Sequence, residues 1–145
     1  MKRMRWFLML AGMAVLVLVL SACGSAGSPP APVSIAEACA PENDGQQASV
    51  SGYFQLDFMV FCTDSCTLGF AEAPGGESPL APDVRVGSGR SQMRELPDDF
   101  QEADFQFTTQ DGTELGLSDR VQISGKMSIA PNVCLMYVDQ ISAAP

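Results

Sequence analysis

Apolar and polar side chains alternate along residues 49–61 of the chain. The apolar parity contains Val50, Phe54, Leu56, Phe58 and Val60 together with Gly52, and the polar parity contains Ser49, Ser51, Tyr53, Gln55 and Asp57. A period of two kept over this length predicts a long strand with one buried face. A glycine in the middle of such a strand indicates a bulge or a bend, so we expect the strand to change direction at Gly52.

Four further stretches show the strand pattern: residues 67–72, 83–88, 119–129 and 132–141. Residues 103–117 predict an additional hairpin that turns at Asp111-Gly112, a pair that suits a type I′ turn. No internal repeat and no long amphipathic helix interrupts this pattern. The sequence therefore predicts an all-β fold, a five-stranded Greek-key barrel with an extra hairpin, over residues 48–145.

The last two predicted strands share a pattern of glycines and alternation, LGLSDRVQISGKMSIAPNVCLMYVDQI in residues 115–141. This pattern is similar to the last two strands of OB-fold domains, in particular the tRNA-anticodon-binding-like group. The chain has Leu-Ser-Asp-Arg-Val where that group usually has Gly-Asp. The resemblance covers about residues 48–142. It implies a barrel that binds oligonucleotides, oligosaccharides or proteins on one face.

The N-terminal residues have the layout of an export signal. Lys2, Arg3 and Arg5 precede an apolar run of 15 residues, 6–20, which is short of the roughly 20 that a spanning helix needs. Leu20-Ser21-Ala22-Cys23 resembles the lipobox of bacterial lipoproteins. The resemblance implies a signal peptide over residues 1–22, cleavage before Cys23 and lipidation of that cysteine. The alternative is a short N-terminal anchor that is never cut.

Lipidation would attach the protein to a cell membrane or an outer membrane, with its domain outside the cytoplasm. Two or three acyl chains are needed, because one chain holds a protein only marginally. Residues 24–33, GSAGSPPAPV, predict a flexible linker that the prolines stiffen in its second half. We therefore expect residues 23–47 to contain the lipidated cysteine, the linker and a short lead-in to the barrel.

The net charge of the expected mature chain limits the classes of molecule that it can bind. Cleavage before Cys23 removes 22 of 145 residues and leaves 123, with five basic and 17 acidic residues and a net charge of −12. Nucleic-acid binding draws its affinity from basic residues that neutralise phosphates, so this charge disfavours nucleic acid as a partner. The acidity is typical of an exported protein that stays soluble, and a protein or glycan ligand is favoured.

Four cysteines remain after Cys23, and in an exported protein an even number predicts disulfides. Cys62 and Cys66 flank a three-residue turn, which would bring their Cα atoms within disulfide range. This leaves Cys39 to pair with Cys134. A zinc site built from the four thiolates and a redox role for Cys62 and Cys66 are the alternatives, but neither the C-x-x-C spacing nor a second close pair is present.

Catalytic chemistry has few candidates in this chain. It contains no histidine, which excludes Ser-His-Asp and Cys-His constellations. The acidic run in residues 95–104 offers Asp98, Asp99 and Glu102 as metal ligands, and the alternative function is a carboxylate-based, calcium-dependent hydrolase. The favoured function is a non-enzymatic binding module without a cofactor. Tyr53 and Tyr137 are its candidate ligand contacts, because their polar tips favour partial exposure.

A short glycine-rich segment, Gly87-Ser88-Gly89 followed by Arg90, has the composition of a loop that cradles a phosphate with backbone N–H groups. Without a following helix, the segment is more typical of a simple loop after the third strand. We therefore expect a loop here.

Overall fold

The computed structural model describes residues 28–56 and 60–145. The expected signal peptide and Cys23 lie outside these residues, as do Asp57 and Phe58 of the first expected strand. The described chain is mostly β. Its elements are α2 (Ile35–Ala38), η2 (Pro41–Asn43), β1 (Gln47–Gln55), β2 (Phe61–Cys62), β3 (Ser65–Thr67), β4 (Gly69–Ala71), β5 (Ala81–Arg85), β6 (Gln92–Met93), η3 (Glu102–Asp104), β7 (Gln106–Thr108), β8 (Glu114–Gly116), β9 (Val121–Ala130) and β10 (Val133–Ala143).

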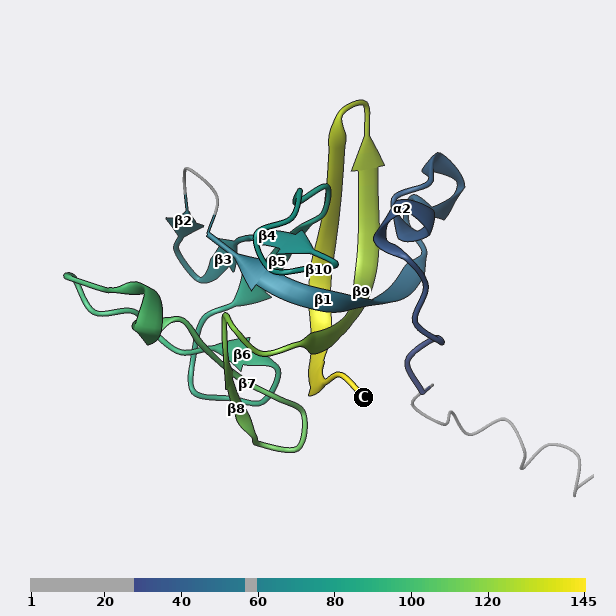
Figure 1. Cartoon of the computed structure of the whole chain (residues 1–145). Coiled ribbons are helices and arrows are strands. Elements are labelled where there is room, and N and C mark those ends of the chain that lie inside the picture. Colours follow the sequence, from purple (N-terminus) through teal and green to yellow (C-terminus); the bar gives the residue numbers. More distant parts are fainter. Residues whose placement is uncertain (1–27, 57–59) are drawn as a thin grey trace, which may run out of the picture.

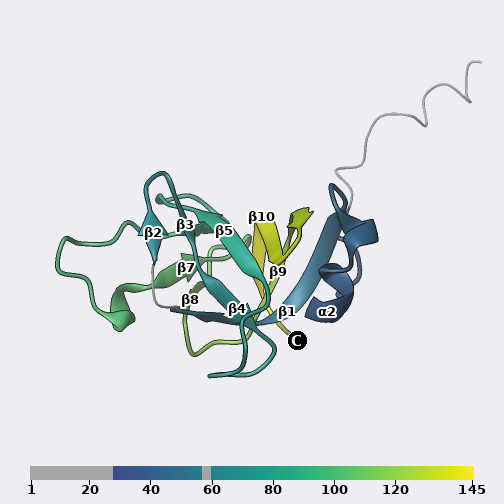
Figure 2. The same ribbon diagram turned by 90° about the horizontal axis from the view of Figure 1, so that it is seen from above.

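The main sheet has the strand order β2-β3-β5-β10-β9-β1-β4. Its neighbours are antiparallel except β10 and β5, which are parallel. A bridge between Phe70 in β4 and Leu80 brings the β4 end of the sheet against the start of β5, the third strand from the other end. The result is the nearly closed, barrel-like sheet that the alternation pattern predicts (Figures 1 and 2).

The bend that we expect at Gly52 is the point where β1 changes partners. Residues 47–52 pair with β9, and residues 53–55 pair with β4. A Cβ atom on Gly52 would lie 2.3 Å from the carbonyl oxygen of Ala71, so a side chain cannot occupy this crossing. The long curved arrow of β1 in Figure 1 shows the strand wrapping from one partner to the other.

A second close approach shapes the hairpin of β9 and β10. Val138 pairs with Gly125 and Gln140 with Ser124, so Asp139 is the extra residue of a β-bulge in β10. A Cβ atom on Gly125 would lie 2.0 Å from the carbonyl oxygen of Tyr137. Glycine at position 125 therefore lets the two strands stay in contact beside the bulge.

The burial of side chains along the first strand agrees only in part with the predicted alternation. Val50 and Phe54 are buried as expected, but Leu56, after the end of β1, is 37 % exposed. The prediction that Ser49 faces solvent is wrong, because this residue is fully buried. The lead-in lies beside β1, where Val33 donates a backbone hydrogen bond to Ser49, and Gln122 donates a side-chain hydrogen bond to the Ser49 hydroxyl.

The extra hairpin is β7 and β8, and β6 adds a third strand to form a small separate sheet. This small sheet and α2 lie on opposite sides of the barrel (Figures 1 and 2). The type I′ turn predicted for the hairpin is wrong, since that turn needs positive φ at both central residues. Gly112 has φ +92°, whereas Asp111 does not have a positive φ. Gly112 donates to the Thr109 carbonyl, so Gln110 and Asp111 are the central residues of the turn and Gly112 follows it.

No helix within residues 28–56 and 60–145 combines the length and apolar character that crossing a bilayer requires.

Candidate functional site

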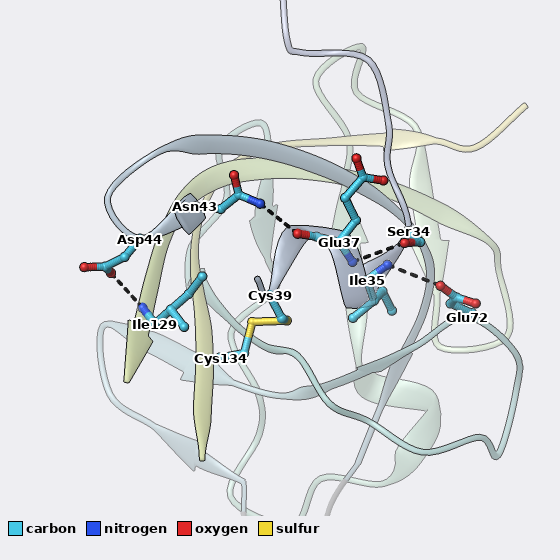
Figure 3. Close-up of a disulfide and its surroundings, with 9 residues drawn as sticks. All are labelled: Ser34, Ile35, Glu37, Cys39, Asn43, Asp44, Glu72, Ile129 and Cys134. Atoms are coloured by element: carbon cyan, nitrogen blue, oxygen red, sulfur yellow. Dashed lines mark hydrogen bonds between the residues drawn. A yellow bond between two sulfur atoms is a disulfide. The ribbon is translucent and has the colours of Figure 1, made fainter. Parts of the chain in front are cut away.

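The lead-in is fixed to the barrel by the predicted disulfide between Cys39 and Cys134, whose Cα atoms are 5.6 Å apart (Figure 3). Hydrogen bonds hold it on either side of this bridge. The Ile35 N–H donates to the Glu72 carboxylate at 3.2 Å, and the Ile129 N–H donates to the Asp44 carboxylate at 2.8 Å. The lead-in is therefore part of the folded body from Val33 onward, where it bridges β1.

The lead-in also has internal bonds that keep its short helix folded. The Glu37 N–H donates to the Ser34 hydroxyl, which makes Ser34 the N-cap of α2 (Figure 3). The Asn43 side chain donates to the Glu37 carbonyl at 2.7 Å. These bonds let a four-residue helix persist, because a helix this short is not stable alone.

The second predicted disulfide, between Cys62 and Cys66, is also confirmed. The two cysteines are register partners across β2 and β3, with Cα atoms 4.2 Å apart. Both disulfides together leave no free thiol among the four cysteines after Cys23. Zinc coordination and thiol redox chemistry need free thiolates, so this oxidised form supports neither alternative.

Tyr137, one of the two candidate tyrosines, lies on the solvent side of β10 and is 50 % exposed. Val133, on the same side of this strand, is 54 % exposed, and Leu135 between them is half-buried. Two of the described large apolar side chains with the greatest exposure are thus four residues apart on one strand. We call this side of the sheet the β10 outer face; it comprises Val133, Leu135 and Tyr137 with Asp83 and Arg85 of β5 and Lys126 of β9.

Polar groups stand in register on both sides of Tyr137. Asp83 in β5 and Lys126 in β9 are its direct partners. Thr67 donates a hydrogen bond to the Asp83 carboxylate at 3.4 Å and thereby orients it. One row across five adjacent strands, β3, β5, β10, β9 and β1, therefore consists of Thr67, Asp83, Tyr137, Lys126 and Gln47.

The basic residues of this face are free to meet a ligand. Within residues 28–56 and 60–145, the sole ion pair joins Arg94 to Glu114. Lys126 and Arg85 are exposed and pair with no carboxylate of that part of the chain. Two unpaired cations therefore lie beside an exposed tyrosine in a chain whose net charge is −9.

A hollow of about 700 Å³ lies at the tip of the β9–β10 hairpin, next to the β10 outer face. Val133 belongs to both, so the apolar stripe of β10 continues into the hollow. Its lining is largely apolar: Pro41, Pro79, Ile129, Pro131 and the Cys39–Cys134 bridge. The chemistry that this arrangement offers is apolar contact and aromatic stacking.

Tyr53, the other candidate tyrosine, lies on a different part of the barrel, in β1. It lines a hollow of about 400 Å³ together with Glu102 at the start of η3. Asp98 and Asp99 are exposed in the loop between β6 and η3, which projects from the body (Figure 1). Among the residues that the structure describes, no group of three or more carboxylates or cysteines lies close enough to hold a metal ion.

The glycine-rich segment after β5 folds around a side chain of its own chain. The Gly89 N–H donates to the Gln92 side-chain oxygen at 2.9 Å, and Cβ atoms on Gly87 or Gly89 would collide with that amide. The place that a phosphate oxygen would take is therefore filled by Gln92. This agrees with a loop and not with a phosphate cradle.

One carboxylate of the described chain has a strongly shifted pKa. The Thr109 hydroxyl donates to the Asp111 carboxylate, and the Thr113 N–H adds a second hydrogen bond. These bonds lower the pKa of Asp111 from 3.8 to about 2. They form inside the β7–β8 turn, so the shifted carboxylate stabilises the turn and is not part of a site.

The polar neighbours of Tyr137 are the part of the candidate site that the sequence did not predict. Asp83 and Lys126 lie 54 and 11 positions before Tyr137 in the chain, and only the strand register brings all three together. The alternation of β9 indicates that Lys126 faces solvent, but not which residue stands beside it.

No family model and no curated protein matches this chain. Among solved structures, the chain is similar to "OBody AM3L15 bound to hen egg-white lysozyme". The two share 13 % sequence identity with a TM-score of 0.47, over 81 % of this chain and 93 % of that one.

Proposed function

We propose that this protein is an exported lipoprotein, tethered to a membrane through Cys23, whose OB-like barrel binds a protein or a glycan outside the cytoplasm. Residues 1–22 are the signal peptide, residues 23–47 the lipidated cysteine, linker and lead-in, and residues 48–145 the binding domain. The single observation that carries the binding role is the β10 outer face, with exposed Tyr137 between Asp83 and Lys126.

The strand pairing supports an OB-like barrel. If β3 and β4 are taken as one bent strand, the five main strands are β1, β3–β4, β5, β9 and β10. β1 pairs with β4 and with β9, and β3 pairs with β5. β5 pairs in parallel with β10, and β10 pairs with β9. This is the connectivity expected of a five-stranded Greek-key barrel, and the small sheet is an insertion between its third and fourth strands.

The disulfides and the lead-in support export and tethering. Disulfides persist in oxidising compartments, so two of them in a small domain favour a place outside the cytoplasm. Because the lead-in is fixed at Val33, nine residues, 24–32, join it to Cys23. A flexible linker of that length spans on the order of 15–25 Å, which keeps the barrel close to the bilayer and leaves it free to reorient.

The β10 outer face supports a protein or glycan ligand. An exposed aromatic ring next to exposed aliphatic side chains is typical of interaction surfaces. Asp83, Lys126 and Arg85 add hydrogen-bonding groups of both charges at its edge. The net charge of −12 disfavours an extended phosphate backbone as the ligand.

The intact mass of detergent-extracted protein tests the anchor. We expect a mass that begins at Cys23 and includes a diacylglyceryl and an acyl group. We also expect the other four cysteines to be alkylated only after reduction. A mass that begins at Met1 would contradict the lipoprotein assignment.

Two probes test the β10 outer face. A photo-crosslinking residue at position 137, in cells that produce the full chain, reports a protein partner, and the same residue at exposed position 77 is the control. Chitotetraose titrated against isotope-labelled protein reports glycan binding through the amide signals of β5, β9 and β10. We expect one probe to respond at this face and Tyr137→Ala to weaken the response. If position 77 gives the same adducts as position 137 and the sugar shifts no signal of these strands, the binding role of this face is wrong.

A further inference from the structure

A groove separates the end of β1 from the small sheet, on a different part of the surface from the β10 outer face. It consists of two hollows, of about 400 and 420 Å³, that share Glu102, Leu117 and Ser118. Tyr53 and Leu56 of the β1 end and Pro74 of the loop after β4 form the wall of the first hollow. We call this feature the Tyr53 groove.

The lining of the Tyr53 groove combines apolar area with polar groups. Leu56 is 37 % exposed, and Leu117 is half-buried. The Tyr53 hydroxyl and the Glu102 carboxylate have no hydrogen-bond partner among the described residues, whereas the groove's amide, Gln55, is engaged by Ala73 and Ser78. The tyrosine ring, the glutamate and the exposed Ser118 are therefore the groups left for a ligand.

The acidic residues around the groove favour a ligand with a positive charge. Neither arginine nor lysine lines either hollow. Asp119 lies at its edge, where it accepts a hydrogen bond from Gly116 at 2.7 Å, and η3 carries Asp104 in addition to Glu102. An anion would meet only like charge here, while a cation would meet a carboxylate and the face of an aromatic ring.

We propose that the Tyr53 groove binds an arginine side chain of a basic segment in a partner polypeptide. The guanidinium pairs with the Glu102 carboxylate and stacks on the Tyr53 ring, and the aliphatic stem lies against Leu117. Arginine suits these two contacts better than lysine, because its planar group both stacks on rings and bonds carboxylates through two donors. The hollows have the size of small binding pockets, so a side chain with its neighbouring backbone fits.

This site is independent of the ligand that the β10 outer face binds, and its test can fail separately. The probe is a fluorescein-labelled peptide, Gly-Arg-Gly-Arg-Gly, amidated at its C-terminus, and its binding to the full chain is measured by anisotropy at low salt. A peptide with citrulline in place of both arginines has the same shape and no charge. We expect citrulline to weaken binding at least about tenfold, since it removes both the ion pair and the cation–π contact.

Glu102→Gln and Tyr53→Leu test the two contacts separately. Each is expected to weaken binding of the arginine peptide about fivefold. Glu77→Gln is the matched control, because Glu77 is exposed and lines neither hollow, and it removes the same charge. Glu77→Gln and Tyr137→Ala are both expected to change the affinity less than about twofold.

Three results would overturn the proposal. The first is equal weakening by Glu77→Gln and Glu102→Gln, which would mean attraction to the net charge alone. The second is equal binding of the citrulline and arginine peptides, and the third is no binding of the arginine peptide by the folded wild-type chain. Glu102 is exposed at the start of η3, so Glu102→Gln keeps the fold even if Tyr53→Leu disturbs β1, and circular dichroism checks both variants.

Discussion

The ring of Phe54 in β1 stacks on the ring of Phe107 in β7, with centroids 4.1 Å apart and planes 14° from parallel. Phe70 of β4 meets the same Phe54 ring edge-on at 5.3 Å. All three side chains are buried. The small sheet is therefore not a loose insertion, because its central strand contributes a ring to the interior of the barrel.

Phe107→Ala should destabilise the protein by about 3–5 kcal/mol, since it removes a fully buried ring and leaves a cavity beside Phe54. Phe100→Ala is the control, because Phe100 is 46 % exposed, and we expect it to cost less than about 1 kcal/mol. Urea unfolding followed by circular dichroism measures both. Equal effects of the two substitutions would mean that the small sheet does not unfold together with the barrel.

Two glycines should resist replacement for the same steric reason. An alanine Cβ at position 52 would approach the Ala71 carbonyl oxygen to 2.3 Å, and one at position 125 would approach that of Tyr137 to 2.0 Å. Because backbone atoms cannot move aside as a flexible side chain can, Gly52→Ala and Gly125→Ala should each cost more than about 2 kcal/mol.

Gly116→Ala is the matched control for these glycines. It lies in strand β8, and the nearest atom to its added Cβ would be a carboxylate oxygen of Asp119 at 3.8 Å, an ordinary contact. We expect its stability to stay within about 0.5 kcal/mol of the wild type. A similar loss of stability in all three variants would show that positions 52 and 125 require glycine for its backbone flexibility and not for the close approach of another strand.

The sequence predicts the strands and the disulfides well, because both follow from local rules. Alternation locates the strands, and a three-residue turn brings Cys62 opposite Cys66 and so leaves Cys39 for Cys134. Local rules do not show which strand pairs with which, so they cannot predict contacts that depend on the strand pairing. The sequence does not show that the lead-in covers Ser49, or that Asp83 and Lys126 stand beside Tyr137.

The wrong turn type has a local cause that composition does not reveal. Asp-Gly suits a type I′ turn, but here the Asp111 side chain accepts hydrogen bonds from Thr109 and Thr113. These bonds favour a longer loop, with Gly112 alone in the left-handed region. The Tyr53 groove is likewise invisible in the sequence, since its two hollows are lined by the end of β1, a loop after β4 and residues 102–118.

Acid should weaken the β7–β8 turn in a defined pH range. The pKa of Asp111 falls to about 2 in the folded protein, mainly because the Thr109 hydroxyl and then the Thr113 N–H bond its carboxylate. A lowered folded-state pKa contributes stability that is complete above the unfolded value, 3.8, and is lost as the pH falls through the folded value, about 2.

Asp111→Asn measures this contribution, because asparagine does not ionise. The wild type should be more stable than the variant at pH 6, and the difference should shrink as the pH falls from about 4 to 2. Thermal unfolding of both proteins across this range shows the trend. A difference that stays constant with pH would mean that the carboxylate charge does not stabilise the turn.

The two disulfides should differ in what they contribute to stability, because they close loops of very different length. Cys39 and Cys134 are 95 positions apart, and Cys62 and Cys66 only four. In the chain-entropy description the stabilisation grows with the logarithm of the loop length, to about 4.5 kcal/mol for the long loop and about 2 kcal/mol for the short one. Urea unfolding of the two double variants, Cys39→Ala/Cys134→Ala and Cys62→Ala/Cys66→Ala, compares them.

Removal of the long-loop disulfide should also loosen the attachment of the lead-in to the barrel. In the Cys39→Ala/Cys134→Ala protein, the buried Ile35 and Ala38 side chains and hydrogen bonds such as those of Glu72 and Asp44 still hold the segment, and hydrogen bonds of this kind contribute about 1 kcal/mol each. Amide exchange at Ile35 and at position 39 should therefore become faster, while exchange in β9 outside the tip changes little. Unchanged protection of the lead-in would show that its packing on β1, and not the disulfide, joins this segment to the folded domain.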